Sequence, residues 1–351
     1  MSSSTAEERA VAKIYNSAIA AASIAAAWEV GLLDSLREHG KVNVPQFAAE
    51  HNLDGDSMRG VAVTLAVAEV VVVNYDAQDN TTSVIPGRLF DETYKTKSMF
   101  HWLTLGSGGL FCRMQHELRK DTRSTADSHR DPRAIAYACR ELNRQFYDPV
   151  FWGVMEGLPY KFNSVVDLGC GSGERLMQIL GRYPHTTAIG IDAAGPAIKF
   201  AEGEAQKRGF GDRLSFTVGD AREIQYGDGF ANVDLLTSFL CGHDFWPREN
   251  CITTLRMLRS IFPKVKRFLL GDETRGLLHS AGSAPPVKQV TEDNVPIFAL
   301  GLEFGHVLMD VYIPTMEEWY GVFEEGGWRC VKGHELQKPA FAVIFELEPI
   351  D

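Results

Sequence analysis

The sequence has little of what marks a protein that binds nucleic acid or enters the secretory pathway. Lys and Arg total 35 against 46 Asp and Glu, a formal net charge of −11. So acidic a chain disfavours broad contacts with phosphate backbones or anionic lipids. The N-terminal residues M-S-S-S-T-A-E-E-R lack the basic segment and apolar core of a signal peptide, and the run Ala18–Ala27 is too short to span a bilayer. We expect a cytoplasmic protein with no nucleic-acid or membrane partner.

Cysteine pairing is also missing. The six cysteines include no C-x-x-C pair and no spacing typical of a disulfide framework, so we expect reduced thiols. The chain is, however, long and rich in apolar residues. The chain has 351 residues, 45% of them hydrophobic, which is enough for two domains with substantial cores.

The first 97 residues predict a small helical domain. Residues 6–28 form an apolar helical pattern, and three short helices follow, beginning near Gly31, Val44 and Asp56. Two β-branched runs flanking a polar turn at Asp76–Asn80 then predict a hairpin. Three helices and a hairpin indicate a winged helix over residues 1–97. Its third helix lacks a basic stripe, so we expect a dimerisation domain and a homodimer rather than DNA binding.

Residues 98–160 predict aromatic-rich helices that link the two domains and contribute to a substrate pocket. Arg133, Arg140 and Arg144 have spacings of i, i+7 and i+11, which places them on one helix face. Two interpretations stay open. The three arginines form a solvated basic face that pairs with nearby acids, or one of them binds a substrate carboxylate, whose geometry matches the guanidinium fork.

From residue 161 to residue 351 strands alternate with helices. The alternation predicts a parallel, doubly wound α/β sheet with helices on both faces. The expected parallel strands are Ser164–Leu168, Ala188–Asp192, Leu214–Val218, Val233–Phe239 and Arg267–Gly271. A polar loop is expected at Gly276–Asn294, a helix at Val295–Leu308, and a closing hairpin at Val331–Glu346.

The first of these strands ends in a glycine-rich turn, S-V-V-D-L-G-C-G-S-G-E. Gly169 and Gly171 would let the backbone approach a ligand, and Asp167 would orient the turn or a bound ammonium group. A lone glycine turn is a weak signal, since phosphate and dinucleotide sites also use one. With an acid at the end of each of the next two strands, however, the segment resembles that of class I S-adenosylmethionine (SAM) methyltransferases.

The two later acids have the positions that SAM requires. Asp192 suits the ribose hydroxyls, Asp220 suits the adenine amino group, and the Ala221 N–H suits a ring nitrogen. Ser238, on the fourth strand, is also placed at the cofactor. NAD enzymes share the glycine turn and the first acid, but they usually carry G-x-G-x-x-G, which the turn G-C-G-S-G does not match. We therefore expect SAM.

A histidine follows the fourth strand. His243 has the position of the general base in the winged-helix O-methyltransferases that the chain resembles throughout, and histidine can accept a phenol proton near neutral pH. His306 lies in the apolar segment E-F-G-H-V-L-M. From its spacing alone it is more typical of a buried core residue than of a ligand.

Three segments, G-H-D-F-W-P-R-E-N-C, F-L-L-G-D and L-G-L-E-F-G-H, resemble the α-keto acid C-methyltransferases of nonribosomal peptide antibiotic pathways. The resemblance runs from about Val11 to Glu346. It implies that His243 and His306 hold one metal ion, iron or zinc, that Asp244 orients the substrate or metal-bound water, and that Arg140 binds the substrate carboxylate.

The resemblance implies C-methylation at C3 of a small 2-oxo acid through a metal-chelated enolate, since a chelated cation stabilises enolate charge. The base for the C3 proton stays open among Asp244, His243 and a hydroxide on the metal. Trp102, Phe100 and Met309 are expected around the substrate side chain. Two alternatives remain: a metal-free O-methyltransferase acting on a phenol, with His243 as its base, and a SAM-binding scaffold without catalysis.

Overall fold

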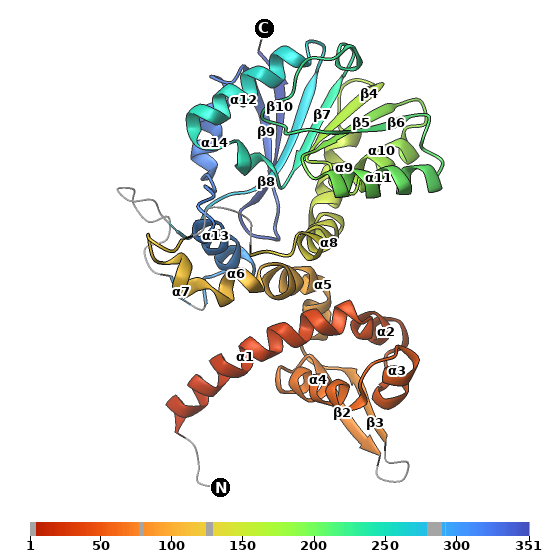
Figure 1. The fold of residues 1–351 in the computed structure, drawn as a ribbon, viewed down its shortest axis with the longest axis vertical. Helices are drawn as coiled ribbons and strands as arrows, with labels where there is room; N and C mark the ends of the chain where they lie inside the picture. Colours follow the sequence, from red (N-terminus) through yellow and green to blue (C-terminus); the bar gives the residue numbers. More distant parts are fainter. Residues whose placement is uncertain (1–4, 77–80, 124–128, 279–289, 292, 351) are drawn as a thin grey trace. The chain divides into compact units, whose positions relative to one another are not determined.

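The structure is a computed structural model that describes residues 5–76, 81–123, 129–278, 290–291 and 293–350 (Figure 1). The chain forms two compact units. The first unit comprises Met1–Arg113 and Ser128–Leu142, and the second comprises Met114–Asp127 and Asn143–Asp351. The division into 1–97, 98–160 and 161–351 with separate roles stays a prediction.

The first unit is mainly helical with one small antiparallel sheet, ordered β1-β3-β2. Its elements are α1 (Ala6–Glu29), α2 (Leu32–His39), β1 (Val42–Asn43), α3 (Val44–Glu50), α4 (Gly55–Val67), β2 (Val71–Asp76), β3 (Thr81–Pro86), α5 (Phe90–His101), the π-helical turn η1 (Trp102–Gly106), α6 (Gly108–Cys112) and α8 (Pro132–Leu142). The expected three short helices and the two hairpin strands are present. Most of the expected turn lies outside the described residues.

Polar pairs with one deeply buried partner each join α1, α5 and α8. His101 Nε2 lies 2.8 Å from Glu29 Oε2, and Lys97 Nζ lies 2.8 Å from Glu141 Oε1. The Trp28 ring stacks on Tyr137, with 4.7 Å between ring centroids. Lys97 and His101 are buried, so these partners satisfy polar groups that would otherwise cost free energy.

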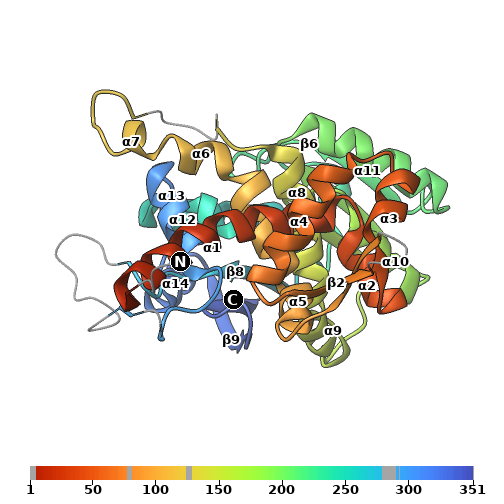
Figure 2. The same ribbon diagram turned by 90° about the horizontal axis from the view of Figure 1, so that it is seen from below.

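Helix α1 packs against α4 and α5 through its C-terminal half, while its N-terminal half is exposed (Figure 2). A capping box starts the helix: the Thr5 hydroxyl accepts a bond from Glu8 N–H, and Glu8 accepts one from Thr5 N–H. Among the described residues, α1 alone is long and apolar enough to cross a membrane. That is weak support for a membrane span, because the core helix of a soluble protein meets the same criterion.

The second unit is an α/β domain. Its elements are α7 (Met114–Glu117), the π-helical turn η2 (Asn143–Tyr147), α9 (Asp148–Glu156), β4 (Ser164–Leu168), α10 (Glu174–Arg182), β5 (Thr187–Asp192), α11 (Gly195–Lys207), β6 (Leu214–Val218), η3 (Asp228–Phe230), β7 (Leu235–Phe239), η4 (Gly242–Phe245), α12 (Arg248–Ile261), β8 (Arg267–Glu273), α13 (Ala299–Leu308), α14 (Met316–Phe323), β9 (Trp328–Glu335) and β10 (Ala342–Pro349).

Its seven-stranded sheet has the order β6-β5-β4-β7-β8-β10-β9. Strands β4 to β8 pair in parallel, and β10 pairs antiparallel with both β8 and β9. The prediction of a Rossmann-like parallel sheet closed by a hairpin is confirmed. The direction of strand progression reverses between β4 and β7, which is where ligands bind in such sheets.

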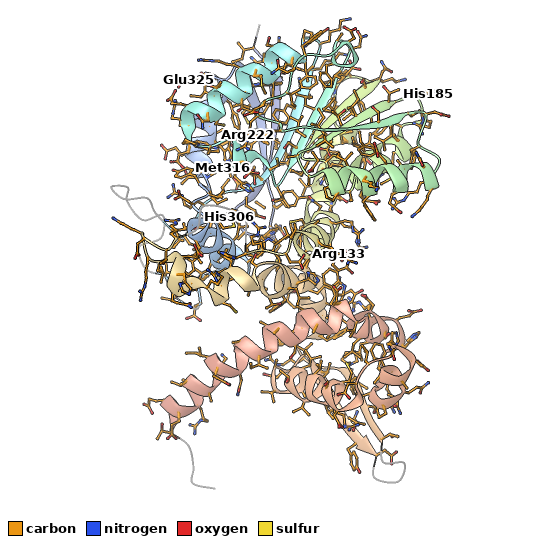
Figure 3. The ribbon with its side chains drawn as sticks, viewed as in Figure 1. Arg133, His185, Arg222, His306, Met316 and Glu325 are labelled. Carbon is orange, nitrogen blue, oxygen red and sulfur yellow. The ribbon has the colours of Figure 1, made fainter. Side chains whose placement is uncertain are left out.

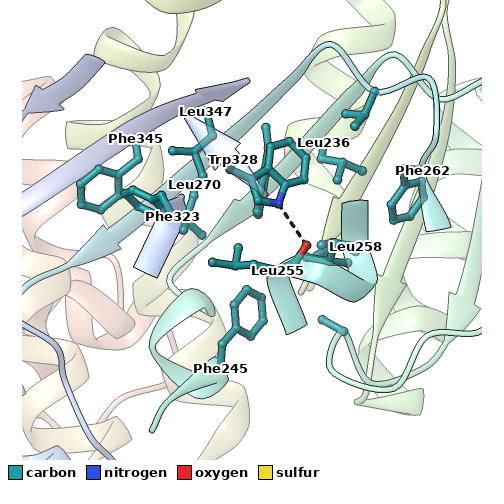
Figure 4. Close-up of a cluster of buried hydrophobic side chains, with 14 of the residues drawn as sticks. Leu236, Phe245, Leu255, Leu258, Phe262, Leu270, Phe323, Trp328, Phe345 and Leu347 are labelled. Carbon is teal, nitrogen blue, oxygen red and sulfur yellow. Dashed lines mark hydrogen bonds between the residues drawn. The ribbon is translucent and has the colours of Figure 1, made fainter. Parts of the chain in front are cut away.

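A hydrophobic core of this unit lies between the sheet and helices α12 and α14 (Figure 4). Trp328 and Leu255 are fully buried there, and Trp328 Nε1–H donates to the Leu255 carbonyl over 3.0 Å. Helices α10 and α11 lie beside β4–β6, away from α12 and α14 (Figure 1). The core thus fixes the strand ends that carry the candidate site.

Candidate cofactor and histidine site

The glycine turn after β4 has the backbone that its sequence predicts. Gly169, Gly171 and Gly173 have φ values of +70°, +52° and +69°, a region that favours glycine. A Cβ on Gly169 would lie 2.8 Å from Cys241 Sγ, whereas one on Gly171 would meet no heavy atom within 4 Å. The turn at Gly169 therefore needs glycine for both its conformation and its close packing.

A cavity of about 280 Å³ opens at the carboxyl ends of the strands beside this turn. Four predicted cofactor residues line it: Gly169, Asp192, Asp220 and Ala221. The remaining lining residues are Ala193, Gly219, Arg222, Phe239, Leu240, Cys241, Asp244 and Phe245. The sequence prediction thus selected residues from three strand ends that the fold brings together.

Asp192 supports the glycine turn from β5. Its Oδ2 accepts a bond from Gly171 N–H and its Oδ1 accepts one from Ala194 N–H, each 2.8 Å long. An ionised carboxylate has about four lone-pair sites, so acceptor capacity remains for a ligand's hydroxyl groups. The geometry suits the predicted ribose contact.

Asp220 carries a partner that the sequence analysis missed. Arg222 Nη2 lies 2.6 Å from Asp220 Oδ2, and this bond lowers the pKa of the Asp220 carboxyl. Arg222 also lines the cavity (labelled in Figure 3). The short segment D-A-R could have revealed this pair, because an arginine two residues after an acid can bind its carboxylate.

Asp167 and Ser238 are buried in the sheet beneath the cavity and do not line it. The Thr237 hydroxyl donates to Asp167 Oδ1 over 2.6 Å. Burial raises the pKa of Asp167 to about 6. The Ser238 hydroxyl has no hydrogen-bond partner among the described residues. Asp167 is therefore bonded to the neighbouring strand β7, and its role at the turn or at a bound ammonium group stays a prediction.

The structure brings the two predicted histidines together. His243 lies in η4, directly after β7, and His306 lies on α13 (labelled in Figure 3). Their ring centroids are 5.0 Å apart and the ring planes meet at 86°. His306 is 4% exposed, and the His243 side chain is 11% exposed. Spacing alone left the role of His306 open, and its position beside His243 favours a shared function.

Each histidine is held through Nδ1. His243 Nδ1 lies 2.8 Å from Asp272 Oδ1, and the His243 backbone N–H donates to Asp272 Oδ2 over 2.6 Å. His306 Nδ1 lies 2.7 Å from the Leu302 carbonyl oxygen, which can only accept. Nδ1 of His306 therefore carries the proton, and Nε2 is the basic nitrogen of its neutral ring.

Asp272, the partner of His243, was not assigned a role from the sequence. It is fully buried at the carboxyl end of β8. The sequence could have indicated it. Asp192 and Asp220 were selected because each is an acid at the end of a parallel strand, and Asp272 meets the same criterion.

The other predicted residues of this unit lie next to the histidines in sequence. Asp244 is exposed and lines the cofactor cavity. Met309 is buried at the C-terminal end of α13, one turn after His306. The structure therefore connects the histidine pair to the cofactor cavity through Asp244.

Arg140, Trp102 and Phe100 belong to the first unit. Arg140 is exposed on α8, with its guanidinium 5.2 Å from the Tyr137 ring centroid. Trp102 is buried under Arg130, and Phe100 packs against the core of that unit. Arg144 lies in η2, in the second unit, so the predicted common face of the three arginines stays a prediction.

Among the residues that the structure describes, no group of three or more His, Cys, Asp or Glu side chains is arranged to hold a metal ion. Within that part of the chain, no third side chain of these types is placed to share an ion with the two histidines.

Comparisons with known proteins agree with this fold. Residues 161–327 match the methyltransferase domain family. The chain is 57% identical over 339 residues to methyltransferase ungE' of Aspergillus campestris, covering 96% of each chain. It is 25% identical over 215 residues to the indolepyruvate C-methyltransferase of Streptomyces griseus, covering 61% of this chain and 60% of that protein.

Human N-acetylserotonin methyltransferase, solved in complex with SAM, has a similar fold. The TM-score is 0.67 at 16% identity, and the alignment covers 100% of both chains. An identity this low supports the fold alone.

Proposed function

The chain belongs to the class I SAM-dependent methyltransferases, and from that premise we propose that it methylates C3 of a small 2-oxo acid. The observation that carries the proposal is the histidine pair, with 5.0 Å between ring centroids beside the cofactor cavity. The name of the S. griseus relative adds support, because indolepyruvate is a 2-oxo acid that this enzyme methylates at carbon.

The histidine pair suits one metal ion, which we propose to be iron or zinc. Metal-binding histidines commonly donate their second ring N–H to a carboxylate or a backbone carbonyl. His243 and His306 have these two kinds of partner, Asp272 and the Leu302 carbonyl. The ring spacing also suits a shared ion, since each ligating nitrogen lies about 2.0–2.1 Å from a metal such as zinc. When bound, the ion would act as a Lewis acid toward the keto oxygen and carboxylate of the substrate.

The residues of the chain have separate roles in the proposed reaction. The cavity at Asp192 and Asp220 binds SAM and presents its methyl group. Asp244, which lines the edge of that cavity, is one candidate to accept the C3 proton, and His243 is another. The C3 carbon then forms a bond to the methyl carbon while the carbon–sulfur bond breaks, and the electron pair stays on sulfur in S-adenosylhomocysteine. Orientation of the two reactants contributes on the order of 7–11 kcal/mol to such a step.

Three further assignments rest on sequence resemblance. We propose that Arg140 binds the substrate carboxylate, and that Trp102, Phe100 and Met309 surround the substrate side chain. We also propose a cytoplasmic enzyme that supplies a nonribosomal peptide antibiotic precursor and acts as a homodimer. The exposed apolar face of α1 supports the dimer.

A metal-free O-methyltransferase is the second candidate. The His243–Asp272 pair favours it, because a carboxylate at Nδ1 orients a histidine and raises its basicity as a general base toward a phenol. In that reaction His306 has no chemical role. The two candidates therefore differ in their dependence on His306 and on metal.

The test is an assay of purified protein with SAM, comparing 2-oxo acids that carry aromatic, aliphatic or guanidino side chains with small phenols. Product mass, bound metal and the effect of a chelator are measured together. We expect a product of a 2-oxo acid heavier by one methylene, and loss of activity and bound metal in His243→Ala and His306→Ala. The exposed residue His185 (Figure 3) provides the control variant, His185→Ala. Full activity in His306→Ala would refute the proposal.

A further inference from the structure

Helix α13 carries a buried acid one turn before His306. Glu303 is 2% exposed, within the apolar sequence A-L-G-L-E-F-G-H-V-L. A carboxylate in such a place costs free energy unless several donors bind it. Its partners therefore indicate what the helix is fixed to.

Three successive backbone N–H groups bind this carboxylate. Glu303 Oε1 accepts from Gly276 over 2.7 Å and from Leu277 over 2.9 Å, and Oε2 accepts from Leu277 over 3.1 Å and from Leu278 over 2.6 Å. Consecutive N–H groups of this kind form a concave anion-binding nest. Burial raises the pKa of Glu303, while the three donors oppose that shift. Helix α13 is thus tied to the segment that leaves β8.

That segment is itself fixed by the loop before β10. The Thr274 N–H and hydroxyl both donate to the Phe341 carbonyl over 2.8 Å. A Cβ on Gly276 would lie 2.5 Å from the Phe341 ring, so the ring packs directly on the glycine backbone. The donors that bind Glu303 are therefore held in place independently of α13.

The end of β8 consequently holds both histidines. Asp272 binds His243 directly, and the N–H groups of residues 276–278 bind Glu303. Residues three apart on a helix lie on the same face, so Glu303 and His306 share one side of α13. A shift of α13 along β8 would change the spacing of the two rings.

The other end of α13 is also tied. Arg123 donates to the Val307 carbonyl and lies 3.3 Å from Asp310 Oδ1. A cation at a helix C-terminus binds its last carbonyl groups and complements the helix dipole. Arg123 thus limits how far the C-terminal end of α13 can move, and Glu303 fixes its position relative to β8.

We propose that Glu303 is a positioning residue that sets His306 opposite His243 by binding the backbone N–H groups of residues 276–278. This inference rests on the proposed function, because it assumes that His306 acts in the reaction. Glu303 itself touches neither cofactor nor substrate.

The test compares Glu303→Gln with the wild type. Glutamine keeps the size of the side chain but replaces one acceptor oxygen with an NH2 group that faces N–H donors. We expect a fall of about 10–100-fold in kcat/KM and in the affinity of metal-stripped protein for Zn²⁺, the range typical of residues that orient a metal ligand. The dissociation constant for SAM should stay unchanged, because the cavity residues lie on other elements.

The matched control is Asp234→Asn. Asp234 is a buried carboxylate that also accepts a backbone bond, from Asn163 N–H over 2.8 Å, but it lies at the opposite end of the sheet. We expect wild-type Zn²⁺ affinity in this variant. Loss of SAM binding in Glu303→Gln would show that this variant does not fold. In that case Glu303→Asp replaces it in the same measurements, because aspartate keeps the charge but its shorter side chain moves the carboxylate away from the N–H donors.

A double variant separates positioning from general stability. If Glu303 acts through His306, then Glu303→Gln weakens Zn²⁺ binding in the wild type. In the His306→Ala background, where only the weak affinity of His243 remains and is titrated at higher Zn²⁺ concentration, it adds nothing. An equal loss of Zn²⁺ affinity in both backgrounds would overturn the inference. It would also be overturned if His306→Ala is inactive while Glu303→Gln keeps the wild-type Zn²⁺ affinity and kcat/KM. Full activity of His306→Ala would instead refute the proposed function itself.

Discussion

Two buried aspartates, one near the end of β4 and one near the end of β8, differ in the groups that bind their carboxylates. Asp272 binds two nitrogens of His243 and the Glu273 N–H. Asp167 binds the Thr237 hydroxyl, and burial raises its pKa to about 6. The first carboxylate serves the histidine site. The second affects how the stability of the protein depends on pH.

We predict that Asp167 destabilises the folded state as pH rises from about 4 to about 6. The folded pKa lies above the ordinary value of 3.8, so the folded state binds the proton more tightly than the unfolded state. The contribution is favourable at low pH and is lost as pH rises through the folded pKa. Two units at 1.36 kcal/mol each give a change on the order of 3 kcal/mol.

The measurement is urea unfolding of wild type and Asp167→Asn without SAM between pH 4 and pH 7. The free energy of unfolding of the wild type should fall relative to that of the variant across this range. Parallel curves for the two proteins would contradict the prediction. Subtracting the free energy of unfolding of the variant from that of the wild type removes the contributions of the other titrating groups, because both proteins contain them.

Sequence analysis identified some site residues and missed others. The two groups differ in whether their binding partners can be recognised from residue types. Asp192, Asp220 and the two histidines follow strand ends or lie in recognisable segments, so their chemistry is visible in the sequence. Glu303 binds the backbone N–H groups of a distant loop. Backbone groups have no residue type, so no pattern reveals such a partner, although a single acid in an apolar helix signals that one exists.

At the scale of elements, the glycine turn allows a direct comparison. Gly169→Ala and Gly171→Ala each place an alanine at positive φ, which costs about 1–2 kcal/mol. Only the Gly169 variant also drives a Cβ against Cys241, which adds about 1–3 kcal/mol for overpacking.

We therefore predict that Gly169→Ala lowers the free energy of unfolding and the affinity for SAM more than Gly171→Ala does. Urea unfolding and calorimetric titration with SAM provide the two measurements, and Gly171→Ala is the control for backbone strain alone. Equal effects of the two substitutions would show that the contact with Cys241 is unimportant.

Element boundaries were predictable where local chemistry defines them. Strands β4 and β6 and helix α3 have their expected bounds, because apolar runs end at glycine or polar residues and Asn43 caps α3. Helix α13 begins at Ala299 rather than Val295, since Phe298 before it has a φ of +81°. The π-helical turn at Asn143–Tyr147 was not predictable from a period of 3.6 residues.

At the scale of the whole molecule, the proposed dimer depends on α1. Four large apolar side chains are exposed along it between Val11 and Ile19: Val11 is 65% exposed, Ile14 74%, Tyr15 72% and Ile19 49%. Spacings of three and four residues place them along one stripe of the helix. A second copy of the chain would bury this stripe.

We predict that Ile14→Glu converts a dimer into a monomer, because it places a charge in the centre of the stripe. Sedimentation equilibrium at micromolar concentration measures the mass of each species. The control is Phe200→Glu on α11 of the second unit, which is 52% exposed in the native chain and should leave the mass unchanged. A monomeric wild type, or a dimeric Ile14→Glu variant, would be inconsistent with the prediction.

The sheet order also determines when the histidine site can form during synthesis. Strand β8 lies between β7 and β10, and β10 leaves the ribosome after the other strands of this sheet. The cofactor half of the sheet, β4 to β7, can pair as soon as it emerges. One edge of β8, the strand that carries Asp272, stays open until β10 inserts, and open edges are where chains associate wrongly. A nascent chain can therefore acquire its cofactor cavity before its histidine site, and it is most prone to aggregate in the interval between the two.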